Sequence, residues 1–191
     1  MRNVVLTATV AIALAAAPAF ARGQKAHKNG GAKQMTDQTF VTKAGSGNMA
    51  EVELGKLAQE KGTSDQVKSF AQRMVTDHTK ANDELKTIAQ NKNITLPSDL
   101  DSHDKALRVR LSKLSGPQFD HAYIQAMVTD HRKVVNEFRH ESQMGKDPEV
   151  KAFASKTLPT IEEHLKLAQD ANKAVGTSGT LDKAKAKTPK K

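Results

Sequence analysis

Four long stretches of the chain place apolar side chains at intervals of three and four residues, which is the spacing of one face of an α-helix. They cover about 37–61, 65–91, 117–144 and 148–175. Within each successive pair, the stretches are separated by a few residues rich in glycine, proline and capping side chains, which end one helix and start the next. The sequence therefore predicts an all-α protein with four long helices.

The lengths of the connections predict how these helices are arranged. Connections of a few residues make the first two helices antiparallel, and likewise the last two. The segment 92–116 is long enough to run the length of the molecule and is expected to carry a short extra helix. The predicted fold is a ferritin-like four-helix bundle, two antiparallel hairpins joined by one long crossover. An up-and-down bundle with an ornamented middle loop is the alternative.

The N-terminal stretch resembles a secretory signal peptide. Arg2 precedes an apolar run over 4–17, and Ala19-Phe20-Ala21 supplies a small-x-small cleavage site. The run is shorter than the ~20 residues needed to span a bilayer. We expect residues 1–21 to be removed and no integral membrane segment to remain; the alternative is an uncleaved anchor. The chain has no cysteine, which excludes disulfides, thiolate metal sites and a lipid-modified N-terminal cysteine.

The formal charge of +9 is concentrated near the two ends of the chain. Residues 22–36 and 176–191 are basic and poor in apolar residues, so we expect a disordered linker and a disordered tail around a neutral bundle domain at 37–175. These basic segments either keep the protein in solution or contact anionic surfaces of the cell envelope. Neither offers an aromatic residue to stack on bases, and export argues against a nucleic-acid partner. The sequence identifies no other partner.

Each long helix places one polar residue on its apolar stripe. Glu51 lies seven residues from Ala44 and from Ala58, on the first helix. The other three are His78, His131 and His164. At ~1.5 Å of rise per residue, the two members of each hairpin lie within about a turn of each other. We therefore predict one buried polar cluster.

One carboxylate and three imidazoles could hold a first-row transition metal ion such as zinc, iron, manganese or copper. Asp77 and Asp130, each next to a cluster histidine, are candidates to support or bridge the ligands. The alternative is a hydrogen-bonded network without metal, because a buried imidazole needs a partner in either case. Only one Glu-x-x-His motif occurs, at 137–140, so a di-iron centre of the usual kind is not expected.

These residues lie in segments that resemble a bacterial family, domain of unknown function 4142, whose members are often labelled outer membrane proteins. The resemblance covers about 40–172 and implies a ferritin-like helical bundle in an exported protein, with no established reaction. Without a lipidated cysteine or strands, peripheral attachment to the outer membrane is the most that the label implies here. The matching segments are Ala50–Ala58, Met74–His78, Phe119–Tyr123, Asp130-His131 and Leu158-Pro159 with His164.

Three classes of function remain for a periplasmic or secreted protein of this kind. The first is a metal-binding or stress-related protein of the envelope. The second is a non-catalytic interaction or structural module. The third is a metal-dependent redox enzyme. The sequence has no phosphate-binding loop, nucleophile elbow or zinc-protease motif. We assign no catalytic residue.

Overall fold

The computed structural model describes residues 35–185, and their side chains as far as residue 176. These residues form five α-helices and no strand, which confirms the all-α prediction. The expected signal peptide and residues 22–34 of the basic linker lie outside the described residues. The helices are α1 (Asp37–Lys61), α2 (Asp65–Asn91), α3 (Ser102–Ser112), α4 (Gly116–Met144) and α5 (Pro148–Lys185).

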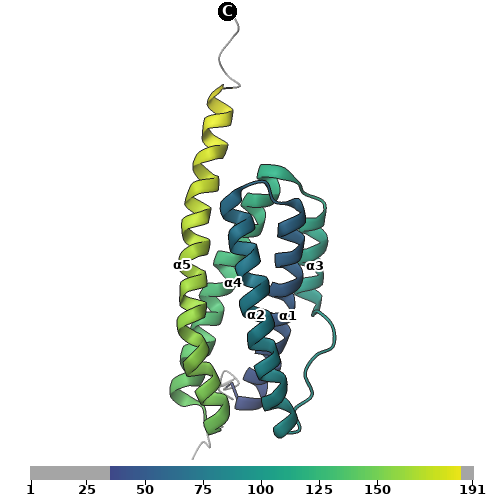
Figure 1. Ribbon diagram of the computed structural model, residues 1–191, viewed down its shortest axis with the longest axis vertical. Helices are drawn as coiled ribbons and strands as arrows, with labels where there is room; N and C mark the ends of the chain where they lie inside the picture. The colour runs from purple at the N-terminus through teal and green to yellow at the C-terminus, as the bar shows by residue number, and fades with distance from the viewer. Residues whose placement is uncertain (1–34, 186–191) are drawn as a thin grey trace, which may run out of the picture. The chain divides into compact units, whose positions relative to one another are not determined.

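The helices associate as two hairpins with a long connection between them (Figure 1). α1 packs along α2 and α4 packs along α5, and each pair is joined by a turn of a few residues, 62–64 or 145–147. Across the hairpins, α2 lies against α5 and α1 against α4. The connection between α2 and α4 carries α3, which contacts both α1 and α4.

Each hairpin turn is held by a carboxylate of the other hairpin. Asp120, 2% exposed on α4, accepts hydrogen bonds from the Thr63 backbone N–H, the Thr63 hydroxyl and the Ser64 N–H, at 2.7 to 3.2 Å. Asp37, in the first turn of α1, accepts two backbone N–H bonds from the α4–α5 turn, at 2.9 and 3.2 Å. These bonds set the height of one hairpin against the other.

We expect Asp120→Ala to lower the free energy of unfolding by about 2 kcal/mol. Removing the carboxylate takes away the one acceptor shared by three donors of the α1–α2 turn and leaves a gap at a buried position of α4. Urea unfolding followed by circular dichroism measures the change. Asp83→Ala is the control, because the Asp83 side chain is 66% exposed and pairs only with Lys86 one helical turn away. Equal stabilities of the two variants would contradict the assigned role of Asp120.

The apolar interior has two clusters with a polar layer between them. Going along α2, Met74 belongs to one cluster and Leu85 to the other, and His78 lies between them. On α4, His131 likewise separates Met127 from Phe138. The layer is therefore flanked on both sides by residues that exclude water.

α5 is longer than the sequence analysis predicts. It continues to Lys185, so residues 176–185, expected to begin a disordered tail, are helical. No proline occurs between 160 and 188, and the stretch 181–185 consists mainly of residues that favour helix. None of the helices within 35–185 combines the length and apolar character needed to span a bilayer.

Candidate metal centre

Three histidines from three helices meet in the polar layer. His78 on α2, His131 on α4 and His164 on α5 are 4%, 2% and 0% exposed. Their ring centroids lie 5.3 to 5.9 Å apart. One nitrogen of each ring can be chosen so that the three atoms lie within 4.8 Å of one another. The structure thus brings together the three histidines that the sequence places in the cluster.

Hydrogen bonds fix the orientation of two of these rings. The His131 Nδ1–H donates to the backbone carbonyl of Met127 at 2.9 Å, one helical turn earlier on α4. His78 Nδ1 lies 2.9 Å from the amide oxygen of Asn48, a buried residue of α1. Since both acceptors are oxygens, the proton of each ring is on Nδ1, and Nε2 carries a lone pair.

The third ring is held by an ion-pair chain at the edge of the layer. His164 Nε2 lies 2.8 Å from Asp77 Oδ2, so Nε2 carries the proton. Arg73 donates to the same carboxylate at 3.2 Å and to Glu163 at 2.7 Å. Asp77, named from the sequence as a candidate supporting carboxylate, therefore holds the His164 ring in place.

The opposite nitrogen of each ring has no partner. His78 Nε2, His131 Nε2 and His164 Nδ1 are buried and make no hydrogen bond in the structure. By the tautomers above, all three carry lone pairs and no proton. These buried lone pairs lack the donors that buried acceptors require. A proton donor or a cation would supply the missing partner.

Burial also keeps the three imidazoles neutral. Burial and the two neighbouring imidazoles hold the pKa of His78 well below its usual value. Burial, with repulsion from His164, lowers the pKa of His131 to about 4. The pKa of His164 is lowered by burial in spite of its bond to Asp77. Neutral imidazole is the form that binds metal ions.

Glu51, the fourth predicted residue, faces a different edge of the cluster. Its carboxyl is 3.7 Å from Nδ1 of His131, the nitrogen already bonded to Met127, and one of its oxygens has no partner. Burial, together with the negative charges of Asp130 and Asp104, raises its pKa well above the usual value. Glu51 thus adjoins the histidines without a ligand atom among their three free nitrogens.

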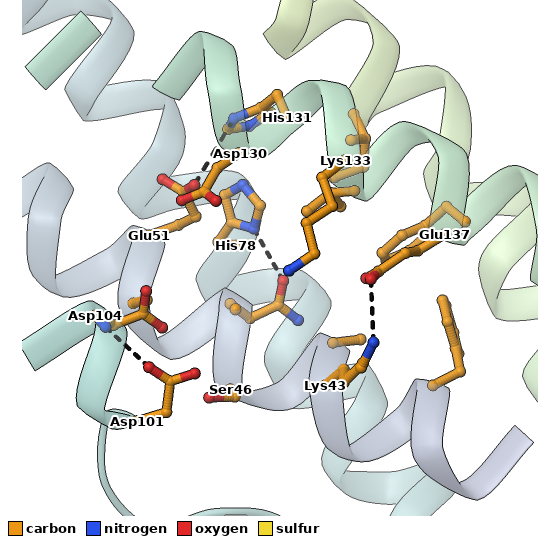
Figure 2. Close-up of a pocket in the computed structure, with 18 of the residues that line it drawn as sticks. Lys43, Ser46, Glu51, His78, Asp101, Asp104, Asp130, His131, Lys133 and Glu137 are labelled. Carbon is orange, nitrogen blue, oxygen red and sulfur yellow. Dashed lines mark hydrogen bonds and ion pairs between the residues drawn. The ribbon is translucent and has the colours of Figure 1, made fainter. Parts of the chain in front are cut away.

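A cavity of about 240 Å³ leads to this layer between α1, α3 and α4. His78, His131 and Glu51 line it, together with carboxylates that include Asp130 and Asp104 (Figure 2). Burial is the largest cause that raises the pKa of both aspartates. Among the hydrogen bonds of the described residues, none joins Asp130 to an imidazole, so Asp130 belongs to the cavity wall.

Two contributors to this site were missed in the sequence. Asn48 holds His78, and it lies four residues after Ala44 and three before Glu51 on the same stripe. That position was a detectable signal, because a buried amide needs a partner. Asp104 comes from α3, whose packing beside α1 had no signal in the periodicity of the long helices.

Two solved structures share this fold. One is CopM in the Cu(I)-bound form, with a TM-score of 0.60, 18% identity, and coverage of 72% of this chain and 95% of that one. The other is a DUF305 protein from Streptomyces coelicolor, described as a candidate secreted protein, with a TM-score of 0.62, 16% identity, and coverage of 74% and 94%. At these identities the likeness concerns the fold.

The sequence matches no protein of curated function. It does match one family model over residues 22–171, which include the three histidines and every residue described around them. The resemblance noted from the sequence is therefore confirmed, and the chain belongs to the family known as domain of unknown function DUF4142.

Proposed function

We propose that this protein is an exported, ferritin-like four-helix bundle that binds one first-row transition metal ion through His78, His131 and His164. The observation that carries the proposal is the set of three buried nitrogens with lone pairs and no partner. The other nitrogen of each ring donates to a fixed acceptor, as is usual for histidines that bind metals. A bound cation would give each of these lone pairs a partner.

Copper, as Cu(I), is the metal that this site suits best. Imidazole is a good ligand for copper and zinc, whereas manganese and magnesium prefer oxygen. Three neutral ligands in a dry layer favour an ion of charge +1, because burying a second positive charge without an anionic ligand is costly. The copper-bound neighbour of the same fold adds support. Zinc is the second candidate and would need a fourth ligand.

Glu51 is the residue that separates these two candidates. Its carboxyl is the nearest buried carboxyl to the cluster, at 3.7 Å from His131. A divalent ion would favour the ionised form of this carboxyl and would gain from its negative charge, by direct ligation after a side-chain rotation or through space. Cu(I) with three imidazoles needs neither. Glu51→Gln is therefore expected to weaken Zn²⁺ binding much more than Cu(I) binding, and equal losses would argue against Cu(I).

The role that we propose is metal binding in the envelope, without turnover. A metal-dependent redox enzyme is the second candidate, because the cavity gives a small molecule a path to His78 and His131. Peroxide or superoxide turnover by the metal-loaded protein would favour that candidate. Export is supported by the signal-like N-terminus and by the description of the DUF305 neighbour as a candidate secreted protein.

The direct test is metal analysis of untagged protein purified from the envelope fraction of its native cells. We expect one copper ion per chain, removal by a Cu(I) chelator, and reloading to the same stoichiometry. His121→Ala is the matched control, since His121 is exposed and bonds only Gln125. Protein that takes up neither copper nor zinc at micromolar free metal would overturn the proposal.

A further inference from the structure

We propose that the cavity between α1, α3 and α4 is the path by which the metal ion reaches the three histidines, and that Asp104 and Asp130 attract the ion into it. The inference rests on the proposed metal site and adds how that site is loaded. It assigns a function to two carboxylates that hold none of the imidazoles.

The cavity connects solvent with the cluster. Its wall includes exposed residues such as Asp101, half-buried residues such as Asp104 and Asp130, and fully buried residues, His78 and His131. The free Nε2 atoms of these two histidines belong to residues of this wall. A cation that enters from solvent would therefore meet carboxylates first and imidazole lone pairs last.

The carboxylates come from three separate helices. Figure 2 shows Asp130 of α4 and Glu51 of α1 extending toward each other, with Asp104 of α3 nearby. Asp104 and Asp130 both act electrostatically on Glu51, whose second oxygen is buried and has no partner. Glu51 is 93% buried, and this oxygen has no partner between the carboxylates of the wall and the histidines.

Charge along the wall favours cations. Five carboxylates and two lysines line the cavity, and Lys43 is already paired with Glu137 at 3.2 Å. Lys133 and His103, which also lines the cavity, both act electrostatically on Asp130. The domain as a whole is neutral between residues 37 and 175, so the negative potential is local to this wall. Clefts of one charge sign with low-dielectric walls raise the association rate of oppositely charged ligands by ~10 to 10³-fold.

Another groove does not offer this path. It lies between α2 and α5, and Arg73, Asp65 and Asp170 are among its lining residues. It contains none of the three histidines. The ion-pair chain of Arg73, Asp77 and Glu163 lies on that side of His164.

The test uses Cu(I), added without oxygen as a weak acetonitrile complex, as the probe and the single tyrosine as the reporter. Tyr123 is fully buried and interacts electrostatically with Glu51, so copper at the cluster should quench its fluorescence. Stopped-flow mixing at low ionic strength gives the association rate constant for the full chain. His164→Ala shows whether the quenching reports the cluster, because His164 is a proposed ligand.

We expect the double variant Asp104→Asn/Asp130→Asn to load about tenfold more slowly than the unmodified protein at low salt, with the difference disappearing in high salt. Lys133→Gln should load faster. Asp83→Asn, a change of the same charge on an exposed part of α2, should have no effect. Asparagine keeps the size of aspartate, and circular dichroism checks that each variant is folded.

The outcomes separate this inference from the metal site itself. Normal equilibrium binding with loading rates equal to those of Asp83→Asn would overturn the path and leave the metal site standing. Faster loading by the double variant would overturn it as well. No copper binding by the unmodified protein would overturn both proposals together.

Discussion

Replacing His131 with alanine should lower the affinity for copper at least ~100-fold. His131 supplies one of three proposed ligands, and losing even a supporting partner of a ligand typically weakens metal binding 10- to 100-fold. His78→Ala and His164→Ala should act alike. Competition titration with a Cu(I) chelator of known affinity measures the change.

Asp77→Asn provides the graded comparison within this series. It keeps an oxygen near His164 Nε2 but removes the negative charge between His164 and Arg73. We expect a loss of about tenfold, smaller than that of any ligand variant. An Asp77→Asn variant as weak as His131→Ala would mean that Asp77 itself binds the ion.

Metal-dependent stabilisation offers a second readout of the same series. A ligand at 1,000 times its Kd adds about 4 kcal/mol to the free energy of unfolding, so copper should raise the Tm of the unmodified protein by several degrees. His131→Ala should lose that rise, and the exposed control His121→Ala should keep it. A histidine cluster that served only as a hydrogen-bonded network would show no copper-dependent rise in any variant.

The helices were predictable because their signals are local. The apolar periodicity of the first helix stops before Gly62, and that of the second starts after Ser64. The structure has the same bounds for these helices, 37–61 and 65–91. The end of α5 was not, because stretches rich in alanine and lysine look alike as a helix and as a solubilising tail. Composition therefore indicates which residues can be helical, but it does not locate the residue at which a helix ends.

The cluster itself was only partly predictable. The placement of His78 and His131 on the stripes follows from single helices, but the meeting of the two hairpins at one level depends on Asp120 and Asp37. Those contacts join residues far apart in sequence. Periodicity also places Glu51 on the correct face of its helix. It does not predict that the Glu51 carboxyl lies near Nδ1 of His131, because the side-chain rotamer of Glu51 decides which nitrogen it approaches.

Asp37 and Glu141 form a second ionisable site, beside the α4–α5 turn, where we expect a pH-dependent stability. Glu141 is 1% exposed beside Asp37. The pKa of Glu141 is raised from 4.5 to about 7. Burial is the largest cause, followed by the hydrogen bond to Asp37 and the negative charge of Asp37. The pKa of Asp37 is lowered although burial opposes this, because the backbone N–H of Lys146 and the Glu141 carboxyl donate to it. At low pH, protonated Glu141 therefore donates to ionised Asp37.

A raised pKa means that the folded protein binds this proton more tightly than the unfolded chain. The contribution of Glu141 to stability is then fully present below about pH 4.5 and is lost as the pH rises to about 7. Glu141→Gln keeps a donor to Asp37 but cannot ionise. We expect the variant to match the unmodified protein near pH 4.5 and to be more stable by about 3 kcal/mol at pH 8.

The measurement is urea unfolding of both metal-free proteins between pH 4.5 and pH 8, and the quantity compared is the difference in unfolding free energy at each pH. The buried imidazoles titrate in both proteins and drop out of this difference. Glu60→Gln is the control, because Glu60 is exposed on α1 and its carboxyl is in water in both states. A difference that stays constant with pH would show that Glu141 has the same pKa in the folded and unfolded states, which would rule out a shared proton between Glu141 and Asp37 at the α4–α5 turn.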